Sequence, residues 1–150
     1  MLTLNANVVR TTDIQQDARR DTMRDLPELH DLIIQNRSPL RNALRLINDN
    51  GMRTCFVVED QGILVGVLTD GDIRRSLLAG STLNDDIARI IKREFVAVQS
   101  GSPIQEIQDA LESIDVLPIV NASGQLVDYA CHQRFHQIPL TEPVFDGNEL

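Results

Sequence analysis

Residues Gly66–Arg75 read Gly-Val-Leu-Thr-Asp-Gly-Asp-Ile-Arg-Arg, so an apolar stretch runs directly into a polar one. The apolar residues before Thr69 are typical of a buried strand, and the spacing of Thr69 and Asp72 is typical of the start of a helix. Such a junction presents backbone N–H groups and the positive end of a helix dipole, which favour phosphate. The sequence therefore predicts a strand-to-helix junction suited to an anionic ligand.

The polar side chains of this junction have two interpretations. In the first, Thr69 offers a hydroxyl, Asp72 accepts charge-assisted hydrogen bonds from both hydroxyls of a ribose, and Gly71 lets the ligand approach the backbone. Arginines then pair with phosphate oxygens, and the candidate ligand-binding residues are Thr69, Asp70, Gly71, Asp72, Arg74 and Arg75. In the second, Thr69 and Asp72 only cap the helix, and the arginines form a solvated face.

The residues around this junction predict a mixed α/β unit. Ser38 and Pro39 are expected to begin a helix whose apolar face ends before Gly51, and Gly80 is expected to stop the helix that starts at Asp70. The turn Glu59–Gly62 separates two apolar stretches that read as neighbouring strands. The expected strands are 32–34, 54–58 and 63–68, and the expected helices are 39–50 and 70–78.

The same order of elements then recurs. A helix over 83–92, a strand over 95–98 and a helix over 102–113 are expected, and Ser102-Pro103 repeats Ser38-Pro39. Gly62 and Gly124 begin similar apolar runs 62 positions apart, whereas the Ser-Pro pairs are 64 apart. The second copy is therefore two residues shorter, near Gly51. Because each copy is too small to bury its own sheet, we expect two copies packed face to face around one shared core.

The duplicated unit with Gly-Val-Leu-Thr-Asp-Gly-Asp-Ile-Arg-Arg resembles the CBS domain, the cystathionine beta-synthase type, over about residues 29–136. The resemblance implies an α/β (α+β) fold of two β-α-β-β-α motifs in a pseudo-symmetric pair. It also implies that Thr69 and Asp72 hold the ribose of AMP, ADP, ATP or S-adenosylmethionine in a cleft between the motifs, and that pairs associate into a flat dimeric disc. The string Thr-Asp-Gly-Asp-Ile-Arg-Arg is similar to CBS pairs attached to sugar-phosphate and sugar-nucleotide enzymes.

The second copy departs from this pattern. At the offset of 62, Thr69 corresponds to Cys131, Asp72 to Arg134 and Gly66 to Asp128. A guanidinium cannot accept hydrogen bonds from a ribose. We therefore expect at most one adenosyl ligand per chain.

Four segments are predicted along the chain: a polar extension (1–28), a first motif (29–80), a second motif (81–136) and a linker (137–150). Within the extension, a sparse apolar pattern suggests a weakly amphipathic helix. Residues 138–150 resemble the opening of PLP-dependent sugar aminotransferases, which implies a catalytic domain beyond the linker.

Composition narrows the function further. With 14 basic and 22 acidic residues the net charge is −8, which disfavours nucleic acids and anionic membranes as partners. The two cysteines lack metal or redox spacing, and neither a signal peptide nor a run of roughly 18 apolar residues is visible, so we expect a cytoplasmic protein.

No nucleophile and base, metal cluster or required cofactor is apparent, so the isolated chain is expected to catalyse nothing. Two hypotheses remain: a regulatory module that senses a nucleotide, or a structural dimerisation and spacer domain. In either case we expect a homodimer through helix faces.

Overall fold

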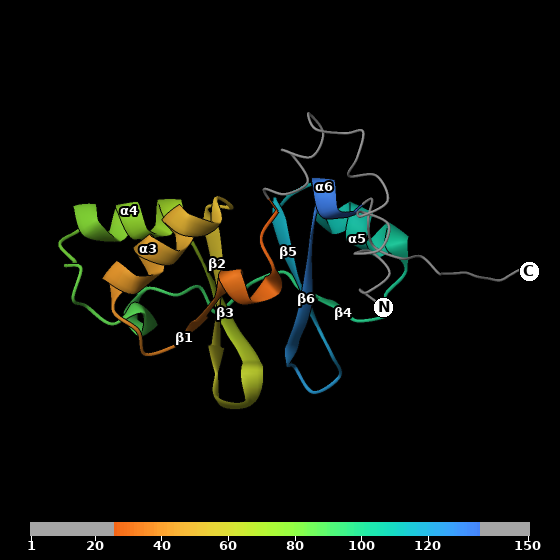
Figure 1. Ribbon diagram of the computed structural model, residues 1–150, viewed down its shortest axis with the longest axis horizontal. Helices are drawn as coiled ribbons and strands as arrows, with labels where there is room; N and C mark the ends of the chain where they lie inside the picture. The colour runs from red at the N-terminus through yellow and green to blue at the C-terminus, as the bar shows by residue number, and fades with distance from the viewer. Residues whose placement is uncertain (1–25, 136–150) are drawn as a thin grey trace, which may run out of the picture.

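The computed structural model describes residues 26–135, which form two similar halves side by side (Figure 1). Each half has a three-stranded sheet in which the first strand runs parallel, and the last antiparallel, to the middle one. The first half contains η1 (Leu29–Leu32), β1 (Ile33–Gln35), α3 (Leu40–Asn50), β2 (Thr54–Glu59), η2 (Asp60–Gly62), β3 (Ile63–Thr69) and α4 (Asp70–Leu78). The second contains β4 (Val98–Gln99), α5 (Ile104–Ala110), β5 (Val116–Val120), β6 (Leu126–Cys131) and α6 (His132–Phe135), and η3 (Ile87–Arg89), which precedes them in the chain, packs against the first half.

The two β-hairpins have the same register, which confirms the predicted repeat. Thr54 pairs with Thr69 in the first half, and Val116 pairs with Cys131 in the second, at the predicted offset of 62. Both middle strands carry an irregularity at matching positions, between Val57 and Val58 and between Ile119 and Val120. The first strands keep the offset of 64, and the two missing residues fall in the shorter helix α5 and its connection to β5.

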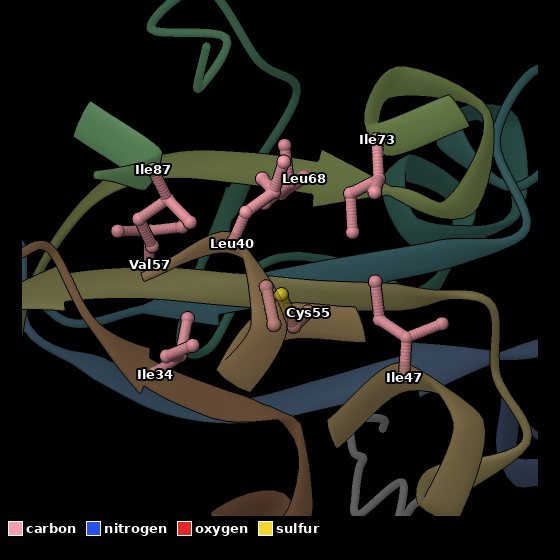
Figure 2. Close-up of a cluster of buried hydrophobic side chains, with 9 residues drawn as sticks. Ile34, Leu40, Ile47, Cys55, Val57, Leu68, Ile73 and Ile87 are labelled. Carbon is pink, nitrogen blue, oxygen red and sulfur yellow. The ribbon is translucent and has the colours of Figure 1, made fainter. Parts of the chain in front are cut away.

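The core consists of three clusters of buried side chains, one of which joins the two halves. In the first half, Leu68 and Ile73 from β3 and α4 pack with residues of α3, β1, β2 and η3 (Figure 2). A second cluster lies within the second half and includes Ile107 and Leu117. The central cluster draws on both halves, with Phe56 and Leu64 from the first and Tyr129 from the second. The predicted shared core is therefore this central cluster, flanked by one cluster in each half.

The predicted helix over 83–92 is wrong. Only the short η3 turn forms there, with Asp86 accepting a hydrogen bond from the Ala88 N–H. The preceding residues instead bond to the start of α3, because the Leu40 and Arg41 N–H groups donate to the carbonyls of Asp85 and Leu83 at 2.8 and 2.9 Å. The apolar spacing of this segment reflects burial of Ile87, which is fully buried, and not a regular helix.

The same contacts change how α3 begins. Ser38 was expected to cap it with Pro39 as its first residue, but Pro39 is the N-cap and makes no side-chain cap. The cap is unnecessary because the carbonyls of residues 83 and 85 already accept the first free N–H groups of the helix. In the second half α5 likewise follows Pro103 and ends at Ala110, earlier than the expected 113.

The expected N-terminal helix and the C-terminal linker lie outside the described residues. Within residues 26–135 there is no helix with the length and apolar character required to cross a bilayer.

Candidate functional site

A cleft of about 370 Å³ lies between the two halves. One wall comes from β2, β3 and the start of α4, and the other from the segment after η3, from the residues just before β5 and from β5 itself. The lining residues are Thr54, Val67, Thr69, Asp72, Lys92, Glu94, Phe95, Val96, Ser113, Ile114, Asp115, Val116 and Pro118. The predicted pair Thr69 and Asp72 thus lies on the wall of an inter-motif cleft.

Thr69 and Asp72 form a complete capping box at the start of α4. The Thr69 hydroxyl accepts from the Asp72 N–H at 3.1 Å, and the Asp72 Oδ2 accepts from the Thr69 N–H at 2.9 Å. This arrangement fixes both side chains at the point where β3 becomes α4. The capping interpretation of the sequence is therefore correct as a description of the local structure, and it places both oxygen-bearing side chains against the cleft.

The second carboxylate oxygen of Asp72 meets two cations. Oδ1 lies 2.7 Å from Arg75 Nη2 and 3.2 Å from Lys92 Nζ, and only 6% of the Asp72 side chain is exposed. Burial by itself raises the pKa of Asp72, but the hydrogen bonds from Thr69, Lys92 and Arg75 outweigh it and hold the pKa below its ordinary value. A carboxylate that is both buried and ionised therefore faces the cleft.

Lys92 reaches Asp72 because the segment that contains Ile91 and Lys92 passes alongside β3 at Gly66 and Val67. The Val67 N–H donates to the Lys92 carbonyl at 3.2 Å, and the Lys92 N–H donates to the Val67 carbonyl at 3.4 Å. A Cβ at Gly66 would lie 3.0 Å from the Lys92 carbonyl oxygen and 3.2 Å from the Ile91 side chain. The glycine of the motif thus makes room for the segment that carries Lys92.

The other predicted ligand-binding residues lie on α4 beside the cleft and do not line it. Asp70 pairs with Arg74 on the exposed side of the helix. Arg75 reaches Asp72, and its guanidinium passes 3.3 Å from the position of a Cβ on Gly71. The structure therefore brings Thr69, Asp72 and Arg75 together, whereas Asp70 and Arg74 form a separate ion pair.

Three charged residues of the cleft were missed by sequence reasoning. Lys92, Glu94 and Asp115 all line it, and they come from segments far from the motif along the chain. No local pattern marks them, since their positions depend on the crossing at Gly66 and on how the two halves pack. The repeat provides the one available signal, because it predicts that the second copy supplies one wall of the cleft.

The corresponding part of the second half is built differently. Tyr129 occupies the register position of Val67, is fully buried, and donates from its hydroxyl to the Pro27 carbonyl at 2.6 Å. Cys131, at the position of Thr69, is also buried, and Arg134 lies in α6. The register therefore confirms the predicted correspondence of Thr69 with Cys131.

Comparison with known proteins agrees with this architecture. Residues 23–79 match the family model of the CBS domain. The chain is 26% identical over 98 residues to arabinose 5-phosphate isomerase GutQ of Salmonella typhi, a match that covers 64% of this chain and 30% of that protein. The chain thus spans about a third of the length of this curated relative.

Solved structures show the same fold at low sequence identity. CBSX2, a CBS-pair protein of Arabidopsis thaliana, in complex with AMP superposes with a TM-score of 0.62 at 18% identity, covering 79% of this chain and 94% of that one. The cytosolic domain of the Mg²⁺ channel MgtE in complex with ATP superposes with a TM-score of 0.60 at 19% identity, and the match covers 71% of this chain and 44% of that one. The chain therefore has the mixed α+β fold of a CBS-domain pair.

Proposed function

We propose that this chain is a regulatory module that binds an adenosyl nucleotide in the cleft between its two motifs, residues 29–80 and 81–136. The observation that carries the proposal is the placement of Thr69 and the ionised Asp72 side by side on the wall of the cleft. CBS-pair structures with AMP or ATP bound support the ligand class. S-adenosylmethionine remains a further candidate from the motif.

The ligand would enter by replacing contacts that Asp72 already makes. A ribose diol donates to the carboxylate, and Arg75 and Lys92, both more than half exposed, are released from Oδ1 to meet a phosphate. The first turn of α4, which contains Asp70 and Gly71, lies next to this point and adds the positive end of the helix, and Arg74 follows in the second turn. Binding thus exchanges two internal ion pairs of Asp72 for contacts with the ligand.

Regulation follows from the position of the cleft. Because its walls belong to different motifs, a bound ligand favours the packing of the two halves that fits it, and this preference can pass to an attached domain. The GutQ relatives support a sugar-phosphate enzyme as that domain. The sequence after residue 137 instead suggested a sugar aminotransferase, and sequencing the gene beyond Leu150 distinguishes the two.

A structural spacer without a ligand is the second candidate. It is favoured by the completeness of the capping box and of the ion pairs, which satisfy Asp72 within the protein. In that case Thr69 and Asp72 stabilise α4 and the crossing segment only.

Isothermal titration calorimetry with AMP, ADP, ATP and S-adenosylmethionine tests the proposal. Asp72→Asn keeps an oxygen that can accept the capping N–H but removes the charge, and we expect about a ten- to hundredfold loss of affinity. The matched control is Asp86→Asn, because Asp86 also accepts a backbone N–H at a helix start but does not line the cleft. Absence of binding to all four compounds, or equal affinity in wild type and Asp72→Asn, would establish the spacer.

A further inference from the structure

Two acidic side chains of the cleft have no partner among the described residues. Glu94, from the segment after η3, and Asp115, from the segment before β5, both line the cleft. Neither makes a hydrogen bond or ion pair with residues 26–135. Both residues are exposed, so their charges remain in contact with solvent. They contrast with Asp72, whose charge is neutralised by its own cations.

Among residues 26–135, the charge balance of the cleft is therefore negative. Lys92 is the one basic residue among the described residues that line it, and it is already paired with Asp72. Even with Arg75 included, the two cations face three carboxylates. A ribose that occupies Asp72 frees both cations for one phosphate group. Each further phosphate adds roughly one negative charge, and no other cation of the part of the chain that the structure describes lines the cleft to meet it.

We propose that Glu94 and Asp115 act as a charge filter, so that the cleft binds a nucleoside or nucleoside monophosphate more tightly than di- and triphosphates. This inference rests on the proposed function, and it adds the ligand subclass and the residues that select it. In the dielectric of bulk water, to which both carboxylates are exposed, a like charge roughly 8 Å away lowers affinity by about two- to threefold, so the two carboxylates together lower it by about three- to tenfold. The effect weakens at high salt, because both carboxylates are exposed.

The test is the affinity of adenosine, AMP, ADP and ATP, measured by calorimetry at low ionic strength with a chelator to remove divalent cations. Wild type should bind AMP most tightly and lose about three- to tenfold with each added phosphate. In the double variant Glu94→Gln/Asp115→Asn, the affinity for ADP and ATP should increase, whereas the affinity for adenosine should stay unchanged. The control Glu106→Gln/Glu112→Gln removes the same charge from exposed positions outside the cleft. It should leave the affinities for all four compounds as they are in wild type.

The outcomes separate the two proposals. ATP binding as tightly as AMP in wild type, or an equal shift in the control and cleft variants, overturns the charge filter and leaves the nucleotide-sensing function standing. Failure of all four compounds to bind any variant overturns the proposed function, and the filter with it.

Discussion

Replacing Gly66 by alanine sets two opposing effects against each other. Gly66 does not have a positive φ, so a Cβ there restricts the unfolded chain and by itself would stabilise the fold by about 0.4–1 kcal/mol. The new methyl group, however, would lie 3.0 Å from the Lys92 carbonyl oxygen and 3.2 Å from Ile91. Relief requires the crossing segment to move, and that segment is held by both hydrogen bonds between Val67 and Lys92.

Loss of those two hydrogen bonds costs about 1–3 kcal/mol, the same range as forced overpacking, so the clash exceeds the entropic gain. We expect Gly66→Ala to lower the free energy of unfolding by about 1–2 kcal/mol in urea titrations analysed at constant m-value. Gly71→Ala is the matched control. Its Cβ would meet only the flexible end of Arg75, at 3.3 Å, and alanine favours the helix by about 0.5–1 kcal/mol. A Gly66→Ala protein as stable as wild type would refute the reasoning.

Three further predictions concern single side chains. Because the pKa of Asp72 is lowered, its stabilising effect is complete above its unfolded pKa of about 3.9 and disappears as the pH falls through the folded value. Asp72→Asn should therefore lower the free energy of unfolding by about 0.5–2 kcal/mol at neutral pH, and the difference from wild type should shrink as the pH falls. A difference in unfolding free energy that stays constant down to pH about 3 contradicts this. Burial raises the pKa of Cys55 to about 12, so its alkylation in the native protein should be at least about a thousandfold slower than in urea, and rapid native labelling by mass spectrometry contradicts this. Leu78, 83% exposed on α4, should lie in a dimer interface, so Leu78→Glu should give a monomer by light scattering whereas Val127→Glu on β6 should not; a monomeric wild type refutes the interface.

The repeat and the strand-to-helix junction were accessible from sequence because both rest on local patterns. Two apolar runs around the turn at residues 59–62 indicated the hairpin of β2 and β3, and the spacing of Thr69 and Asp72 marked the start of α4 correctly. The segment 83–92 misled because a helical spacing of apolar residues is also produced by one buried turn, here around Ile87. Tertiary hydrogen bonds to α3 determined its conformation.

The charged lining of the cleft could not be predicted in the same way. Lys92 lies 20 positions from Asp72, and its contact depends on the crossing at Gly66. Asp115 faces the cleft only because the two halves pack together. The sequence could indicate a candidate site at this junction, but the balance of charge around it requires the three-dimensional arrangement of both copies.

Strand β3 lies at the edge of its sheet, where unpaired backbone groups would serve as a template for strands of other chains. The second copy covers this edge: the Leu64 N–H donates to the Gly124 carbonyl at 3.0 Å, and Val67 is paired with Lys92. A fragment that ended near residue 80 would lose both of these backbone pairings along β3 and would also expose Phe56 and Leu64 of the central cluster. We therefore expect the first copy alone to aggregate, which would make the duplication a protection against misassembly as well as the origin of the cleft.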